Sequence, residues 1–206
     1  MQGLGVTLAL AGIVWLVGIV FGTLLGAWAH SDKSVAKGLN ATSFVASALP
    51  ILVVLMWLHF PAQALIGLVI DPFITTALAL SLVNLALVGD TVCRTLDSLP
   101  EEWALAGRTS GLNDRQIFRK ITLPLATRQL LGPVMMIQLT MLHSTLFASL
   151  ISVDELFRTI QRINAIEYKP IELYTLLAIF FFAICAPLQW IAVQARRRFS
   201  QDTSLR

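Results

Sequence analysis

The chain has 206 residues, of which 56% are hydrophobic and 13% charged, and its formal net charge is +3. Its mean hydropathy of +0.76 lies far above that of soluble proteins, so composition excludes an ordinary soluble fold and indicates an integral membrane protein. The length allows one compact domain over residues 1–206, and the small net charge gives no argument for a nucleic acid partner. Cys93 and Cys185 lie in or beside apolar runs without metal-ligand spacing, so we expect buried thiols and no metal site.

Five apolar runs approach or exceed the roughly 20 helical residues that cross a bilayer core. Backbone groups in lipid must be hydrogen-bonded internally, so these runs are predicted to be helices. The second run is long enough for a span plus a re-entrant or loop segment on the outer side. The sequence therefore predicts an all-α polytopic membrane protein with five transmembrane helices. The predicted spans lie within Leu4–His30, Gly38–Ile70, Pro72–Gly89, Gln129–Val153 and Leu173–Ala195.

Small residues and prolines inside these runs carry further predictions. In the first run, which lacks the basic start of a cleaved signal peptide, Gly18, Gly22 and Gly26 recur every four residues. Such a face lets another helix approach closely, either within this chain or from another subunit. Prolines within later spans remove a backbone donor and are expected to kink their helices, as packing features or as parts of a pathway. They are Pro50, Pro133 and Pro187.

The distribution of Lys and Arg predicts the orientation, because cytoplasmic loops of membrane proteins carry an excess of these residues. The loops after the first and third spans and the C-terminal tail are basic. We therefore expect them in the cytoplasm and the N-terminus outside. Their basic residues are Lys33, Lys37, Arg94, Arg108, Arg115, Arg119, Lys120, Arg128, Arg196, Arg197, Arg198 and Arg206, against Arg158, Arg162 and Lys169 on the other side.

The most informative segment is Leu99–Pro124, a charged, helix-prone island in an otherwise apolar chain. Pro100 suits a first helical turn, and Glu101 and Glu102 suit the positive N-terminus of a helix. Gly111 is expected to end this helix or to turn the chain with a positive φ.

A second short helix is predicted after that glycine, capped by Asn113 or Asp114. Leu123-Pro124 is expected to stop this helix and lead back to the membrane. Two short helices joined at a glycine form a compact knob, which is either an ordinary surface hairpin or a docking surface. The residues predicted on one apolar face of the second helix are Ile117, Phe118 and Ile121.

The order of residues in this segment resembles the EAA loop of importer-type ABC permeases. That loop has a Glu-Ala-Ala triplet, then a Gly, then a hydrophobic-x-Leu-Pro close. Leu105 stands where the family has Glu, and Gly107 stands at the second Ala, while Glu102 lies one helical turn earlier and is a candidate for the acidic role. The matching positions are Pro100, Ala106, Gly111, Phe118 and Leu123-Pro124.

Other segments are similar to one subfamily, and on them the chain is identified as a member of the polar amino acid uptake permeases of the histidine, glutamine and arginine type. Gly3–Leu8 resembles their Gly-x-x-x-Thr-Leu opening, and Ser149–Leu156 resembles their Ser-x-Ile-x-Val-x-Glu-Leu segment after the fourth span. Asp90 falls where the subfamily usually has Glu, and Cys93 occupies the place of an Arg that this chain carries at Arg94.

The resemblance implies a type I ABC importer permease fold in the bacterial inner membrane, with an ATPase-coupling loop at about residues 95–128. It also implies a cytoplasmic ATPase dimer, a periplasmic substrate-binding protein and a second permease subunit, either a second copy or a related chain. The sequence has no Gly-x-x-x-x-Gly-Lys-Ser/Thr loop, so ATP and Mg²⁺ are expected on the partner and no cofactor on this non-enzymatic chain. The expected coupling residues are Glu102, Ala106, Gly107, Gly111, Arg115, Phe118, Leu123 and Pro124.

Ionisable and polar groups at membrane depth are the candidates for a substrate pathway. Asp90 either faces a cavity or pairs with Arg94. The cluster His143-Ser144-Thr145 lies in the fourth span, in a neighbourhood that faces the pathway in the resembling family, although His143 can equally bond a neighbouring helix. Asp154 and Glu155, at the outer end, are expected to contact the binding protein or to cap a helix. The remaining outer acids slightly favour a cationic amino acid; they are Asp71, Glu167 and Glu172.

Other classes of function remain open. The leading interpretation is the permease subunit of an importer for a polar amino acid or a related compound such as an opine. A membrane scaffold without transport activity is the alternative, supported by Leu105 and by the unusual His143 cluster. An intramembrane enzyme is disfavoured because His143 and Ser144 are adjacent and point to different sides of a helix. A channel is disfavoured because no acidic ring or Gly-rich filter segment stands out.

Overall fold

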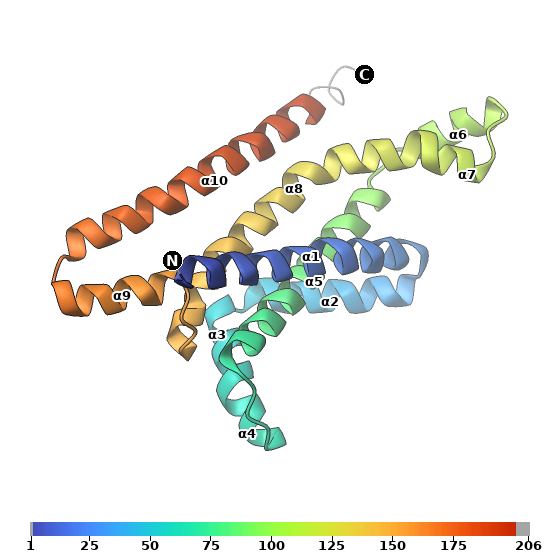
Figure 1. The fold of residues 1–206 in the computed structure, drawn as a ribbon. Coiled ribbons are helices and arrows are strands. Elements are labelled where there is room, and N and C mark those ends of the chain that lie inside the picture. The colour runs from blue at the N-terminus through green and yellow to red at the C-terminus, as the bar shows by residue number, and fades with distance from the viewer. Residues whose placement is uncertain (1, 201–206) are drawn as a thin grey trace.

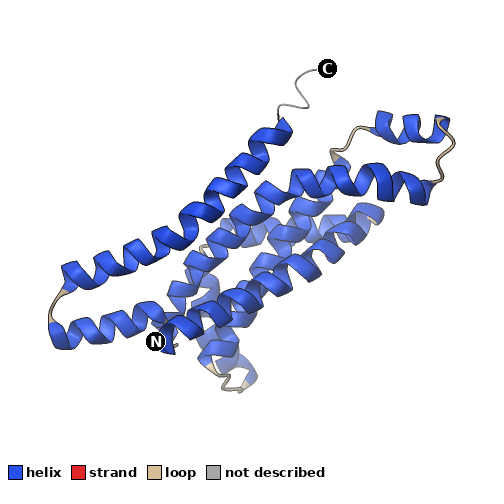
Figure 2. Ribbon diagram, turned by 45° about the horizontal axis from the view of Figure 1, so that its top comes forward, coloured by secondary structure: helices blue, strands red, loops and turns tan. Residues whose placement is uncertain are grey.

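The computed structural model describes residues 2–200, and every regular element in that range is a helix (Figures 1 and 2). The side chains of residues 195–200 and all of residues 201–206, which include the predicted cytoplasmic Arg196, Arg197, Arg198 and Arg206, lie outside the described part. The helices are α1 (Gln2–Ser31), α2 (Lys33–Ala48), α3 (Ile51–Trp57), η1 (Leu58–Ala62), α4 (Gln63–Ile66), α5 (Pro72–Asp97), α6 (Glu101–Thr109), α7 (Asp114–Ile117), η2 (Phe118–Thr122), α8 (Leu123–Ser144), η3 (Thr145–Ile151), α9 (Leu156–Glu167) and α10 (Pro170–Ser200).

Each of the five predicted apolar runs forms helix, but the second is not a straight span. Four helical stretches are long and apolar enough to cross a membrane, and the pair Lys33–Ala48 and Ile51–Ile66, bent by 100°, makes a fifth if it is counted as one broken span. Pro50 lies at the bend as the residue that caps α3, and Leu49 before it is extended with ψ 132°. A residue before proline is sterically disfavoured in the helical region, so the chain turns there instead of kinking within one helix. The four straight stretches are Gly3–Ser31, Pro72–Asp97, Asp114–Ile151 and Pro170–Gln194.

The glycine repeat of the first run packs against α5 of the same chain. A Cβ on Gly18 would overlap the side chain of Asn84, and one on Gly22 would lie 2.9 Å from Cβ of Val88. A Cβ on Gly26 would overlap the carbonyl oxygen of Gly89. The contact positions advance together along both helices, so α1 and α5 run parallel at close range. The predicted close packing is confirmed, and this face is occupied within the chain.

A buried polar cluster joins α1, α5 and α8 near the middle of this packing. The Asn84 amide donates to the Val14 carbonyl at 2.8 Å and to Gln138 Oε1 at 2.9 Å, and Gln138 returns a bond of 3.1 Å. Trp15 Nε1 donates to the Gln138 backbone oxygen at 2.9 Å. Interhelical bonds of this kind hold membrane helices together where the hydrophobic effect does not.

The helix that begins at Asp114 does not stop at Leu123-Pro124. It continues through η2 and α8 to Ile151 as one stretch of 38 residues, so the predicted stop is wrong. Pro124 follows the π-helical turn η2, in which the Leu123 amide bonds the Phe118 carbonyl. This wider turn changes the hydrogen-bond register just where proline has no N–H to give and would crowd the preceding carbonyl of a regular α-helix. The helix therefore carries the knob and the fourth span on one axis.

The last two helices form the side of the molecule away from α2 (Figure 1). α9 begins beside the start of α1, and α10 runs back along α8. Much of α10 has exposed apolar side chains, as expected for a lipid-facing span or for a contact with another subunit. Among its exposed residues are Leu176, Ile179, Phe182 and Trp190.

Candidate functional site

The first candidate site is the knob formed by α6, α7 and the turn between them. Pro100 precedes α6 as its cap residue, with Glu101 and Glu102 in the first turn, as predicted. Gly111 has a φ of +81°, which an L side chain rarely adopts. The glycine turn between the two short helices is therefore confirmed.

The second helix of the knob starts with a capping box, in which side chain and backbone of two residues bond each other reciprocally. The Gln116 amide donates to the Asn113 side chain at 2.9 Å, and the Asn113 amide donates to Gln116 Oε1 at 3.0 Å. Arg108 on α6 pairs with Asp114 at 3.1 Å. Of the two predicted caps, Asn113 is the one that the structure uses, and Asp114 connects the two helices instead.

Gly107 is the contact point between α6 and the helix that follows. Gly107 is buried, and a Cβ added to it would lie 3.0 Å from Ile117 Cγ1 and 3.1 Å from Ile121 Cδ1. Glycine at this position therefore lets both isoleucines approach α6 closely, whereas a larger side chain would require them to shift. Phe118 does not share their face: it is 51% exposed, whereas Ile117 is 5% exposed.

The surface of the knob combines a groove with exposed apolar side chains. The groove has a volume of about 410 Å³. Leu105, at the position of the family Glu, is 56% exposed. Phe118, on the following helix, is also exposed, and the role of this surface in docking a partner stays a prediction. The lining residues are Glu102, Trp103, Ala106, Gly107, Ser110, Leu112 and Ile121.

A second groove, of about 370 Å³, separates the knob from the adjoining ends of α1 and α5. His30 Nδ1 lies 2.6 Å from Asp97 Oδ1 and joins the last turns of those two helices. Trp103 and Ile121 line both grooves, so the knob is set directly against the bundle.

Asp90 lies two turns before the end of α5 and pairs with Arg94. The Arg94 Nε donates to Asp90 Oδ2 at 2.9 Å, and its Nη2 donates to Asn40 Oδ1 on α2 at 3.2 Å. Of the two alternatives for Asp90, the structure shows the ion pair. Its role in a substrate pathway stays a prediction.

The three residues of the predicted polar cluster in α8 and η3 point in different directions. Ser144 is buried and donates to the Thr140 carbonyl at 2.8 Å, and Thr145 is buried and donates to the Leu142 carbonyl at 2.7 Å. His143 is exposed and its ring centroid lies 6.3 Å from that of Phe181 on α10. The hydroxyls therefore satisfy their own helix, and only His143 presents a polar edge away from it.

The buried cluster of Asn84, Gln138 and Trp15 is the polar feature that sequence reasoning missed. An Asn and a Gln inside apolar spans were the available signal, because amides at membrane depth need partners. Their pairing depends on three helices from distant parts of the chain, which no local pattern indicates.

The acids of the segment before α9 divide into one exposed and one buried side chain. Asp154 is exposed and pairs with Arg158 at 3.2 Å and with Arg162. Glu155 is 0% exposed and caps α9, with its carboxylate accepting from the Phe157 and Arg158 amides at 2.8 Å each. The capping alternative is thus the one realised for Glu155, and a surface contact of its side chain with a binding protein is wrong for this conformation. That contact stays a prediction for Asp154.

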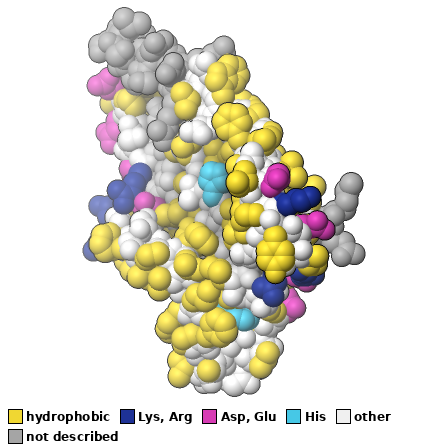
Figure 3. Space-filling model, turned by 90° about the vertical axis from the view of Figure 1, so that its left-hand side faces the viewer, with side chains coloured by type: hydrophobic (Ala, Val, Ile, Leu, Met, Phe, Trp, Pro, Cys, Tyr) yellow, Lys and Arg dark blue, Asp and Glu magenta, His cyan; other side chains and the backbone are white. Residues whose placement is uncertain are grey.

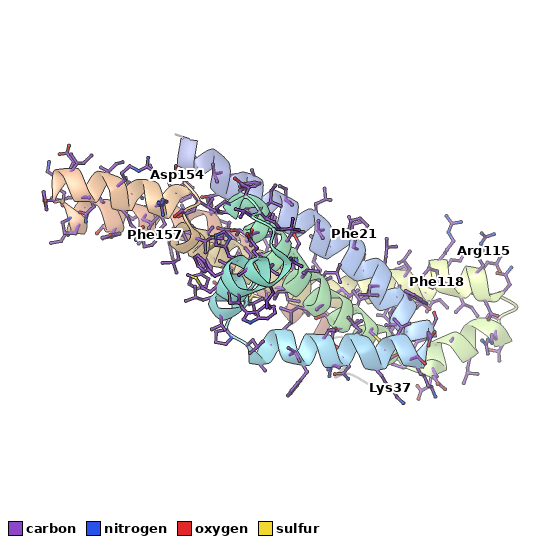
Figure 4. The ribbon with its side chains drawn as sticks, turned by 90° about the horizontal axis from the view of Figure 1, so that it is seen from below. Phe21, Lys37, Arg115, Phe118, Asp154 and Phe157 are labelled. Carbon is purple, nitrogen blue, oxygen red and sulfur yellow. The ribbon has the colours of Figure 1, made fainter. Side chains whose placement is uncertain are left out.

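The knob and the segment before α9 lie at opposite ends of the bundle. Lys37, Arg115 and Phe118 are at one end of the bundle, and Asp154 and Phe157 are at the other (Figure 4). The face seen in Figure 3 has hydrophobic side chains over much of its area and charged side chains mainly on its flanks.

Comparison with known proteins identifies the family. Residues 18–201 match the family described as the binding-protein-dependent transport system inner membrane component. The chain belongs to this family. It is a transporter permease subunit embedded in the membrane.

Two curated relatives support the family assignment over most of the chain. The octopine transport system permease OccQ of Rhizobium meliloti is 30% identical over 197 residues, covering 89% of this chain and 83% of the relative. The arginine ABC transporter permease ArtQ of Haemophilus influenzae is 26% identical over 184 residues, covering 86% and 83%.

Solved structures show the same fold. The structure described as an amino acid ABC transporter with histidines superposes with a TM-score of 0.82 at 21% identity, covering 96% of this chain and 92% of the other. The inward-facing MetNI methionine ABC transporter gives a TM-score of 0.74 at 18% identity, covering 96% and 94%. The predicted ABC permease fold is confirmed.

Proposed function

We propose that this permease subunit moves a polar amino acid or an opine inward across a bacterial inner membrane, driven by a separate ATPase that docks on the α6–α7 knob. The observation that carries the proposal is the continuous helix from Asp114 to Ile151. It joins one half of the knob to a membrane span without a flexible link.

This helix gives a mechanical route from the knob to the bundle. α8 packs against α5 and α10, so a displacement of α7 reaches two further spans. The capping box and the Arg108–Asp114 pair stabilise the knob, and Gly107 holds α6 against the same helix. A force applied to the groove on α6 is therefore transmitted to α8 through packed side chains.

The proposed orientation puts the knob and the C-terminus in the cytoplasm and the N-terminus outside. The knob shares its end of the molecule with Lys37 (Figure 4). By the positive-inside rule, this clustering of basic residues supports a cytoplasmic position for that end. Asp154 then faces the periplasm, where we place its contact with the binding protein. ATP and Mg²⁺ belong to the ATPase in this proposal.

A second permease subunit, a copy of this chain or a related one, completes the proposed pathway. The exposed apolar face of α10 offers area for either lipid or such a subunit. Within this chain, His143 and Asp90 are the candidates for lining the pathway. The curated relatives named for octopine and arginine support a polar, cationic or opine substrate.

Disruption of the knob tests the proposal. The complex is purified by a tag on this chain, and its ATPase content and binding-protein-dependent uptake of labelled arginine, glutamine, histidine and octopine are measured in proteoliposomes. Gly107→Ile puts a branched side chain against Ile117 and should lower ATPase recovery and uptake at least tenfold, since overpacking costs about 1–3 kcal/mol. Gly38→Ile is the matched control, because a Cβ there meets nothing within 4 Å.

Undiminished ATPase binding and uptake in Gly107→Ile would overturn the docking site. A complex that assembles and hydrolyses ATP but moves none of the four solutes would favour the alternative of a non-transporting scaffold or asymmetric partner. The exposed Leu105 in place of the family Glu is the observation that favours this alternative.

A further inference from the structure

Two sequence motifs that neither the knob nor the pathway uses meet at the other end of the bundle. Gly3–Leu8 opens α1, and Ser149–Leu156 links η3 to α9. The Leu156 amide donates to Thr7 Oγ1 at 3.1 Å, across 149 positions of sequence. Thr7 Oγ1 also lies 3.5 Å from Glu155 Oε2 and donates to the Gly3 carbonyl at 3.1 Å. We name these residues, Gly3, Thr7, Glu155 and Leu156, the joint.

The joint is dry and closely packed. Glu155 is 0% exposed and Thr7 1% exposed. The Glu155 carboxylate accepts two backbone amides of α9, so the first turn of that helix is fixed to the same buried group that faces Thr7. Burying a carboxylate costs free energy unless its lone pairs accept hydrogen bonds. These hydrogen bonds therefore favour one specific arrangement of α9 against α1.

Gly3 makes the close approach possible. A Cβ at this position would overlap Thr159 Oγ1 and would lie 2.9 Å from the Glu155 carbonyl oxygen. Thr159 itself donates to that carbonyl at 2.9 Å. The first turn of α1 therefore rests on the backbone of α9, with room for glycine and for no larger residue.

The position of α9 gives this contact a consequence. α10 packs along α8 and, near its start, against α9, and α9 packs against α1 (Figure 1). Phe157 on α9 and Tyr174 on α10 have ring centroids 6.2 Å apart. α10 thus packs directly on α8, the span that carries the knob. It is connected to the α1–α5 pair through α9 and the joint.

We propose that Thr7 and Glu155 are positioning residues that fix α9 to α1, so that α10 keeps its place relative to α1 and α5 while α8 moves. The inference about position follows from the contacts alone. Its consequence for transport rests on the proposed function: with the joint broken, α8 displaces less of the bundle per cycle, and ATP is hydrolysed without an equivalent amount of solute moved.

The test uses the full chain in lipid nanodiscs, with its ATPase, and compares hydrogen exchange of the α9 amides among variants. Thr7→Val keeps the shape of the side chain and removes the acceptor of the Leu156 amide. It should raise exchange of residues 156–168 about tenfold, because a buried donor loses its partner. Thr7→Ser should restore protection. Thr23→Val is the matched control: it makes the same change on the same helix, at a hydroxyl that bonds the Val20 carbonyl of its own helix, so exchange of the α9 amides should not change.

A second readout separates positioning from mere folding. ATP hydrolysed per solute transported should rise at least threefold in Thr7→Val and return in Thr7→Ser, with equal amounts of assembled complex. Glu155→Ala should act in the same direction; if it does not insert, the Thr7 pair decides. Unchanged α9 exchange in Thr7→Val, or equal loosening in Thr23→Val, would overturn the joint. If the chain binds no ATPase, the proposed function fails while the exchange result still tests the joint.

Discussion

The knob and the joint lie at opposite ends of the molecule and are held together by opposite means. The knob is built from contacts within one short segment: the Asn113–Gln116 capping box, the Arg108–Asp114 pair and the approach of Gly107 to Ile117. The joint is built from residues 148 positions apart that exclude water. Local contacts leave the surface of the knob exposed for a partner, whereas a buried contact between distant segments fixes the helices of the bundle relative to one another.

Overpacking the joint should give the largest effect on stability. Gly3→Val places two methyl groups against Thr159 and the Glu155 carbonyl and should destabilise the chain by about 2 kcal/mol. Thermal unfolding in nanodiscs, followed by tryptophan fluorescence, measures the loss. Gly5→Val is the control, because a Cβ at Gly5 meets nothing within 4 Å. Equal melting temperatures for the two variants would mean that α1 does not rest on α9.

Removing the cap of the knob should have a smaller and local effect. Asn113→Ala leaves the Gln116 amide without its acceptor and should cost about 1 kcal/mol, the usual value of a helix N-cap. We expect exchange of the amides of residues 114–118 to rise about fivefold, with α9 unchanged. Thr109→Ala, which removes a hydroxyl bonded only within α6, is the comparison variant. If α9 also loosened, the two ends would not be independent.

This contrast explains what the sequence could predict. The helix starts at Pro100 and Asn113, the turn at Gly111 and the close packing of the glycine repeat depend on spacing and local conformation, and each is found in the structure. The predicted stop at Pro124 was wrong because a π-helical turn before it lets the helix continue although proline has no N–H to donate. This change of hydrogen-bond register cannot be read from the order of the residues.

The buried polar contacts were out of reach for a different reason. Glu155 was predicted as a helix cap or a binding-protein contact, and the cap is found, but its complete burial beside the start of α1 was not predicted. Likewise, the pairing of Asn84 with Gln138 depends on how α5 and α8 cross. Long-range packing decides these positions, and one sequence does not contain that geometry in local form.

Restoring the family acid on the knob tests the proposed docking of an ATPase on its surface. Leu105→Glu places a carboxylate on an exposed position of α6. We expect ATPase affinity to rise about threefold at low salt, within the range of up to about 1 kcal/mol for an exposed ion pair. Leu105→Gln separates charge from polarity, and the gain should fade at 1 M salt. A loss of affinity in both variants would instead show that the partner's groove is apolar at this point.

The pH dependence of the joint should be the smallest effect, and its sign is fixed by burial. Desolvation raises the pKa of Glu155 above its ordinary value of 4.5, while the hydrogen bonds from Phe157 and Arg158 act against this rise. The folded chain then binds a proton more readily than the unfolded chain between 4.5 and the raised pKa. Stability from this group is therefore greatest at low pH and decreases as the pH rises through that window.

Glu155→Gln removes the titrating carboxyl group while keeping a hydrogen-bond acceptor. The melting temperature of the native chain minus that of the variant therefore measures the contribution of this carboxyl group to stability. This difference should shrink from pH 4.5 upward and then level off. If the difference between native chain and Glu155→Gln grew with rising pH, the two amide donors would outweigh desolvation. The ionised carboxylate itself would then be what holds α9 in place.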